Sequence, residues 1–190
     1  GSGDHLMEIK SSADNITIKD IKIKDYDENN DGGAIDITTS GTVTIQDCHF
    51  DGNSTTTSYD EGAAISTVSA TTNIKRCIFS NNSTSNNTSV SIVYTEGGMT
   101  MENCLFYDNS AASTTYSGIV KIDDGTNTIT NCTFTENTGG DVVYIWDGNT
   151  TYIRNCLFYN NTGSYDVEEH NTYSSYPIML NCYYEGRTGT

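Results

Sequence analysis

The stretch "IQDCHFDGN", Ile45 to Asn53, recurs along the chain and decides how it folds. Four close copies follow it: "IKRCIFSNN" from Ile74, "MENCLFYDN" from Met101, "ITNCTFTEN" from Ile129 and "IRNCLFYNN" from Ile153. Two weaker copies are "IKDIKIKDY" from Ile18 and "MLNCYYEGR" from Met179. Successive copies lie 24 to 29 residues apart. A near-constant period of this length is typical of a solenoid, in which each unit buries its apolar side against its neighbours.

Composition and charge narrow the possible partners of the chain. Only 35% of the 190 residues are hydrophobic, which alone would be typical of a disordered chain, but the repeat outweighs that interpretation. The net charge is −16 with nine Lys and Arg residues, which argues against nucleic acid as a partner because phosphate binding requires a basic surface. Since no run of about 18 apolar residues occurs, we expect no direct membrane insertion.

The spacing within each copy predicts short strands joined by a corner. The step from Cys48 to Phe50 is two residues, as in a strand, whereas the step from Ile45 to Cys48 is three. We expect the extra residue, just before the Cys position, to form a corner in the left-handed region that Asn and Asp tolerate. The corner residues are Asp20, Asp47, Arg76, Asn103, Asn131, Asn155 and Asn181.

A second strand signal lies 12 or 13 residues before most of the Cys positions. Its aligned apolar residues are Ile35, Ile65, Ile92, Val120 and Val143. We therefore predict an all-β, single-stranded parallel β-helix of about six to seven coils of 24–29 residues. Residues 1–12 are interpreted as a cloning scar and lead-in, 13–187 as the repeat domain and 188–190 as a tail. In the last coil, Pro177 and the pair Glu168–Glu169 are interpreted as devices that blunt a sheet edge.

Identical residues should stack from coil to coil, about 4.8 Å apart. The predicted structural core ladder comprises Cys48, Cys77, Cys104, Cys132, Cys156 and Cys182 with Phe50, Phe79, Phe106, Phe134 and Phe158. That spacing exceeds the distance of about 3.8 Å between the Cβ atoms of a disulfide, so we predict buried free thiols, with pairing of consecutive rungs as the alternative. A column of Asn side chains is predicted to form a second ladder: Asn53, Asn82, Asn109, Asn137 and Asn161.

Two short motifs give the chain a family resemblance. They are "GGAI" at Gly32–Ile35, with its variant "GAAI" at Gly62–Ile65, and Phe-x-x-Asn, which starts at Phe50, Phe79, Phe106, Phe134 and Phe158. The motifs resemble the repeats of chlamydial polymorphic outer-membrane proteins, and "NCTF" resembles adhesin-like surface proteins of methanogenic archaea. The resemblance implies a right-handed parallel β-helix repeat protein at the cell surface or outside the cell. It also implies a host-cell, microbial or glycan receptor as partner.

A candidate metal site lies in "DYDENNDGGAID". Its possible calcium ligands are Asp25, Asp27, Asn29, Asp31 and Asp36. The spacing matches the first part of a calcium loop, but the Glu at the twelfth position is absent. Asp, Asn and Gly are also ordinary turn residues. We interpret the segment as an acidic turn, with calcium as the alternative, and expect no other cofactor.

Candidate ligand-binding residues are aromatic. Insertions after three successive Phe positions should form one lateral ridge, and further aromatic residues lie on or beside the second strand. The candidates are Tyr59, Tyr94, Tyr116, Tyr144 and Trp146. The alternative is that these residues simply favour strands. Possible N-glycosylation sites of the ridge are Asn53, Asn82 and Asn86.

The sequence shows no distinctive catalytic group. Outward carboxylates such as Asp36, Asp47 and Glu102 form no recognisable pair, and the cationic residues do not cluster. We therefore expect a non-enzymatic adhesin-like fragment. The alternatives are a polysaccharide lyase or hydrolase fragment and a purely structural spacer.

Overall fold

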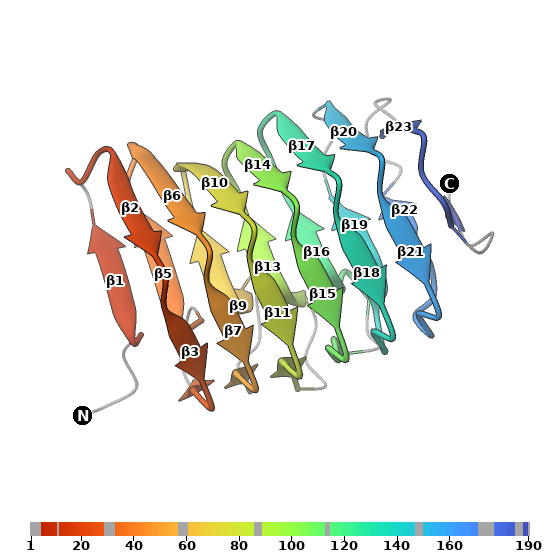
Figure 1. Cartoon of the computed structure of the whole chain (residues 1–190), viewed down its shortest axis with the longest axis horizontal. Helices are drawn as coiled ribbons and strands as arrows, with labels where there is room; N and C mark the ends of the chain where they lie inside the picture. The colour runs from red at the N-terminus through yellow and green to blue at the C-terminus, as the bar shows by residue number, and fades with distance from the viewer. Residues whose placement is uncertain are drawn as a thin grey trace.

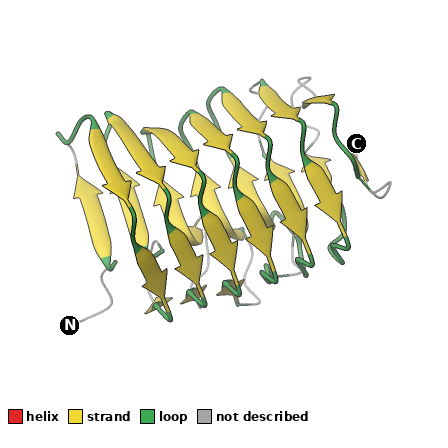
Figure 2. Ribbon diagram, in the orientation of Figure 1, coloured by secondary structure: helices red, strands yellow, loops and turns green. Residues whose placement is uncertain are grey.

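The chain folds into one elongated solenoid whose two termini lie at opposite ends (Figure 1). The computed structural model describes residues 5–10, 12–28, 33–56, 61–85, 89–112, 115–146, 150–170, 177–184 and 188–189. These residues form short strands joined by turns and bends (Figure 2), and each strand pairs in parallel with its equivalents in the neighbouring coils. The described part of the chain contains no helix that is long and apolar enough to cross a membrane.

Four sheets run along the solenoid. The eight-stranded sheet contains β1 (Met7–Lys10), β5 (Ile35–Thr38), β9 (Glu61–Thr67), β13 (Val90–Thr95), β16 (Gly118–Ile122), β19 (Asp141–Ile145), β22 (Val167–Glu169) and β24 (Thr188–Gly189). The seven-stranded sheet contains β2 (Ile16–Lys19), β6 (Thr42–Gln46), β10 (Thr71–Lys75), β14 (Met99–Glu102), β17 (Asn127–Thr130), β20 (Thr151–Arg154) and β23 (Ile178–Leu180).

The two smaller sheets complete each coil. The six-stranded sheet contains β3 (Lys22–Lys24), β7 (His49–Asp51), β11 (Ile78–Ser80), β15 (Leu105–Tyr107), β18 (Thr133–Thr135) and β21 (Leu157–Tyr159). The three-stranded sheet contains β4 (Asp27–Glu28), β8 (Ser54–Thr55) and β12 (Ser83–Thr84). The chain passes through the three larger sheets in turn, and the predicted parallel β-helix is thereby confirmed.

The corner before each Cys position is left-handed, as predicted. All seven corner residues have φ between 51° and 57°. Arg76 also adopts this conformation, and its guanidinium donates hydrogen bonds of 2.6 and 2.7 Å to the two carboxylate oxygens of Asp47, the corner residue of the preceding coil. This contact holds the pKa of the Asp47 carboxyl below its usual range. The same corner is thus built in every coil although its residue type varies.

A second left-handed corner lies two residues after each aromatic position. The sequence interpretation missed this column, which comprises Asp25, Gly52, Asn81, Asp108, Glu136 and Asn160. Most of its members are again Asn, Asp or Gly, the residue types that adopt positive φ at least cost. Two corners per repeat therefore turn the chain around the six-stranded sheet.

The core of the solenoid is a stack of Phe rings. All five Phe side chains are completely buried, and neighbouring ring centroids lie 4.4 to 5.0 Å apart with interplanar angles of 4° to 17°. Beside them runs the Cys column, which contains free thiols: five are buried, and Cys182 in the last coil is half-buried. The Sγ atom of Cys104, for example, lies 3.4 Å from the carbonyl oxygen of Glu102. Few apolar residues suffice for this core because most of them fall in inward columns.

The buried Asn column forms a continuous amide ladder. The Nδ2 group of Asn109 donates to the Phe79 carbonyl at 2.9 Å and to Asn137 Oδ1 at 2.9 Å. Its Oδ1 atom accepts from the backbone N–H and the Nδ2 group of Asn82. The same pattern links Asn53 to Asn82 and Asn137 to Asn161. Each amide from Asn53 to Asn137 therefore joins its own coil to both neighbours.

The strand register corrects one predicted alignment. Ile65 lies beside Val93 rather than Ile92, because the pairing of β9 and β13 shifts by one residue between Ser91 and Val93. Two glycines of the signature tetrapeptides lie nearby: a Cβ atom on Gly33 would lie 1.7 Å from the Gly62 carbonyl oxygen, and one on Gly62 would lie 1.9 Å from the Ile65 carbonyl oxygen. The backbone of the next coil at Gly33, and that of the same strand at Gly62, lies too close for any larger residue.

Candidate functional site

Polar residues on the outer face of the eight-stranded sheet are unusually buried. On β16, Val120 and Ile122 point into the core, so Lys121 between them points outward. In register with Lys121 are Tyr94 on β13 and Tyr144 on β19. All three outward side chains are buried. These outward side chains are therefore shielded from solvent, whereas side chains on the outer face of a solenoid sheet are usually exposed.

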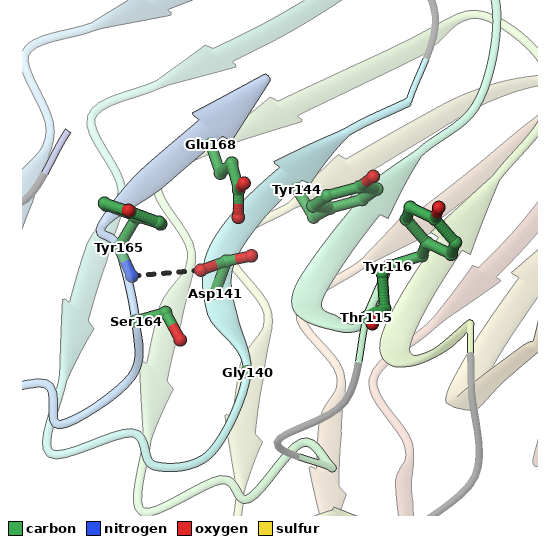
Figure 3. Close-up of a pocket in the computed structure, with 8 residues that line it drawn as sticks. All are labelled: Thr115, Tyr116, Gly140, Asp141, Tyr144, Ser164, Tyr165 and Glu168. Carbon is green, nitrogen blue, oxygen red and sulfur yellow. Dashed lines mark hydrogen bonds between the residues drawn. The ribbon is translucent and has the colours of Figure 1, made fainter. Parts of the chain in front are cut away.

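A pocket opens on this face in the C-terminal half of the solenoid (Figure 3). Its volume is about 360 Å³. The pocket is formed by strands β19 and β22 and by the segments that precede β16, β19 and β22. Its lining residues are Thr115, Tyr116, Gly140, Asp141, Tyr144, Ser164, Tyr165 and Glu168. Tyrosine rings and carboxyl groups thus share one cavity, so aromatic faces and hydrogen-bonding groups are available to the same ligand.

Two carboxyl groups meet at the wall of the pocket. Asp141, the first residue of β19, and Glu168 on β22 point toward one another (Figure 3). Asp141 is buried, and its Oδ1 atom accepts the backbone N–H of Tyr165 at 2.9 Å. Burial and the nearby Glu168 carboxyl group raise the pKa of Asp141 to about 8. The Asp141 carboxyl group therefore keeps its proton at neutral pH.

An aromatic cluster forms the opposite side of the pocket. The ring of Tyr116, a residue in the left-handed region with φ 72°, lies edge-on to Trp146 with the centroids 4.5 Å apart. His170 stacks on Trp146 at 4.5 Å, and Tyr144 lies 6.1 Å from Tyr116. The Tyr144 hydroxyl is buried without a hydrogen-bond partner, and burial together with the Glu168 charge raises the pKa of that hydroxyl. Rings at such angles and distances form a rigid aromatic wall.

A buried cation lies beside the pocket but is already neutralised. The Lys121 ammonium donates to Asp123 Oδ2 at 3.0 Å and to Ser89 Oγ at 2.8 Å. It also lies 5.0 Å from the centre of the Tyr94 ring, whose hydroxyl donates to the same Asp123 oxygen at 3.0 Å. Because these contacts occupy the ammonium, Lys121 supplies no positive charge to the pocket.

Only some of the aromatic residues predicted to bind a ligand lie at the pocket. Tyr116 and Tyr144 line the pocket, and Trp146 lies directly behind Tyr116. The prediction that Tyr94 offers a ring to a ligand is wrong, because Tyr94 is buried between Lys121 and Asp123. Tyr59 lies outside the described residues.

The candidate calcium residues are not brought together in the described part of the chain. Asp25 forms a 2.8 Å ion pair with Lys24, and Asp27 accepts the Ser54 hydroxyl at 2.8 Å near the three-stranded sheet. Asp36 belongs instead to the eight-stranded sheet, where its carboxylate lies 3.7 Å from His5. Asn29 and Asp31 lie outside the described residues.

A different set of possible metal ligands lies at the N-terminal end. It comprises His5, Glu8 and Asp36, whose ligand atoms lie within 4.8 Å of one another. Glu8 and Asp36 are register neighbours on β1 and β5. Burial raises the pKa of Asp36, which lowers its value as an anionic metal ligand.

Two of the predicted glycosylation sites are buried. Asn53 and Asn82 have no exposed surface, because their amide groups belong to the ladder inside the solenoid. The prediction that they are accessible ridge residues is therefore wrong. Asn86 lies outside the described residues.

The carboxylates singled out from the sequence are not the ones in the pocket. Asp47 is held by Arg76, and Glu102 forms a 3.5 Å pair with Lys75 on the seven-stranded sheet. Asp141 was missed, and Glu168 was assigned to edge protection. One signal could have identified Asp141. The strand register pairs Ser91 with Gly118 and Gly118 with Asp141, and of these three equivalent positions only the last carries an acidic side chain.

Comparison with known proteins places the chain by its fold. A family model described as "Right handed beta helix region" matches residues 1–119 and, in a second overlapping match, residues 84–190. The two matches together span the whole chain, and the description agrees with the right-handed coil expected from the sequence motifs. No curated protein and no solved structure matches the chain.

Proposed function

Because the chain belongs to the family of right-handed β-helix regions, we propose that it is a non-enzymatic, glycan-binding segment of an adhesin-like protein at the cell surface or outside the cell. Membership of the family is consistent both with adhesion and with polysaccharide processing. The observation that carries the proposal is the pocket on the eight-stranded sheet, which combines tyrosine rings with hydrogen-bonding carboxyl groups. Sugar rings have apolar faces that suit aromatic walls and hydroxyls that suit carboxyl groups.

The position of the carboxyl groups supports binding. Asp141 and Glu168 lie on the neighbouring strands β19 and β22 and point toward one another at the wall of the pocket (Figure 3). Glycoside hydrolases instead hold their two carboxyl groups about 5 to 9.5 Å apart, on either side of the scissile bond. Two carboxyl groups on one wall are better suited to forming hydrogen bonds with a ligand from one side.

The test is a titration of the purified chain with a panel of glycans. Trp146 is the single tryptophan of the chain and contacts Tyr116, so its fluorescence reports on the pocket. We expect at least one glycan to change this fluorescence in a saturable manner, and Tyr165→Ala to weaken that binding. The matched control is Tyr159→Ala, which removes an exposed tyrosine of the six-stranded sheet. If no glycan binds, the proposal fails and only a spacer role remains.

A glycan-processing enzyme is the second candidate, and one observation favours it. The raised pKa of Asp141 keeps a carboxylic acid protonated at neutral pH, as a general acid requires. Release of new reducing or unsaturated ends from polysaccharides, abolished by Asp141→Asn, would support this candidate. Binding without any such release would support the adhesin-like function instead.

A further inference from the structure

The wall of the pocket at Asp141 and Glu168 offers a place for a positive charge. The pocket presents these two carboxyl groups beside tyrosine rings, and none of its described lining residues is Lys, Arg or His. A neighbouring ammonium, that of Lys121, is bound by Asp123 and Ser89. Asp141 is buried beside a second carboxyl group, so it keeps its proton unless a cation takes that place.

We propose that this pocket selects sugars that carry a free, positively charged amine, and that the ammonium of the ligand binds between Asp141 and Glu168. The inference rests on the glycan-binding function proposed above and specifies its ligand class. The binding step is balanced: the ammonium donates N–H groups to both carboxylates, and the proton that leaves Asp141 goes to solvent. Hydrogen bonds between charged groups of this kind are the stronger ones in proteins.

The groups around the pair suit a cation and disfavour an anion. From β19 the pair faces Tyr144, and from the segment before β22 it faces the Tyr165 backbone N–H, which already holds one Asp141 oxygen. Tyr116 closes the side next to β16 (Figure 3). Tyrosine faces attract ammonium groups through their quadrupoles. A uronic acid would place a third carboxylate here, which the charge of the pair repels.

A metal ion is a poorer occupant of the same position. Calcium requires six to eight oxygen ligands. One oxygen of Asp141 is already engaged by the Tyr165 N–H, which leaves few charged oxygens for an ion. An ammonium needs only three acceptors and is stabilised further by the neighbouring rings. The geometry therefore favours an organic amine.

Four tetrasaccharides test the inference in titrations followed by Trp146 fluorescence and by calorimetry. They are built from glucosamine, N-acetylglucosamine, glucose and galacturonate. We expect the glucosamine tetramer to bind at least about tenfold more tightly than the N-acetylated one, the ratio expected for losing a hydrogen bond to a charged group. Near pH 6 the amine is charged and Asp141 is still protonated. Calorimetry in two buffers should then show release of about one proton per amine bound.

Two substitutions locate the effect. Asp141→Asn and Glu168→Gln keep the shape of the pair but remove one ionisable group each, and both should abolish proton release and the preference for the amine. The control Glu102→Gln removes a carboxylate of the seven-stranded sheet and should leave binding unchanged. Thermal melts establish that each variant is folded.

The outcomes separate this inference from the proposed function. Equal or tighter binding of the neutral or acidic tetramer would overturn the amine preference while leaving glycan binding intact. Amine binding that survives both substitutions, or releases no proton, would also overturn it. Calcium binding in place of the amine would assign the pair to a metal and refute the inference. Failure of every sugar would overturn both proposals together.

Discussion

Asn109, in the middle of the amide ladder, offers a sharp test of how the coils are held together. Its buried side chain makes four hydrogen bonds, two to Asn82 and one each to the Phe79 carbonyl and Asn137. At about 1 kcal/mol per bond, Asn109→Ala should lower the free energy of unfolding by about 4 kcal/mol. Asn161 makes three described bonds of this kind, so Asn161→Ala should cost about 3 kcal/mol.

The isosteric change Asn109→Asp separates hydrogen bonding from packing. The volume is unchanged, but the carboxylate lacks both N–H donors and would face the Phe79 carbonyl and the Asn137 amide oxygen directly. We expect a loss at least as large as that of the Ala variant, because a buried carboxylate among acceptors also carries an unpaired charge. An explanation based on packing alone predicts a loss below about 1 kcal/mol.

Urea unfolding at pH 7 measures these losses from the transition midpoints. The control is Asn103→Asp in the same coil, at an exposed corner where Asp20 and Asp47 show that aspartate is accepted. This control should change stability by less than about 0.5 kcal/mol. If Asn109→Asp proved no more destabilising than Asn103→Asp, the amide ladder would not hold the coils together, and the reasoning would be refuted.

Three further predictions concern the corners, the thiols and the pocket. Asn131→Val should destabilise the fold by about 1 to 2 kcal/mol in thermal melts because φ is 54° there, whereas Asn131→Gly should cost much less; similar losses for both would contradict the corner assignment. A thiol reagent should modify Cys182 quickly and the five buried cysteines only after unfolding, because burial shields their Sγ atoms; contact with the Cys132 thiol and burial also raise the pKa of Cys104 to about 12, and rapid modification of several thiols in the native protein would contradict this. Because the pKa of Asp141 is raised from 3.8 to about 8, the folded chain binds a proton that the unfolded chain releases, so this group's contribution to stability falls as pH rises between these values. Melting temperatures from pH 5 to 8 should therefore fall less steeply for Asp141→Asn than for the unmodified chain, and equal slopes would count against the raised pKa of Asp141.

The fold was largely predictable from the sequence because its constraints are local and repeated. The three-residue step from Ile45 to Cys48 required a corner, and the structure places a left-handed residue there in every coil. The error at Ile92 arose because one strand shifts its register, which an alignment by spacing alone does not reveal.

The pocket was much less predictable. Asp141 and Glu168 come from different coils and meet only because β19 and β22 lie side by side. Neither residue belongs to the repeated Cys-x-Phe phrase, so the repeat does not mark them. The burial of Tyr94 also escaped prediction, because it depends on Lys121 and Asp123 in the next coil. The repeated residues therefore determine the solenoid, whereas residues that differ from coil to coil form the pocket.

The amide ladder also gives the solenoid a direction. From Asn53 to Asn137, every described side-chain amide donates to the Asn amide oxygen of the next coil and to a backbone carbonyl of the preceding coil, so each junction between coils presents the same chemistry. A duplicated coil inserted in the ladder would find a matching Asn acceptor in the coil on its C-terminal side and a matching Asn donor in the coil on its N-terminal side. Gene duplication can thus lengthen such a solenoid by one coil at a time without changing the hydrogen bonds at any junction between coils, while the sequences of the outer loops diverge.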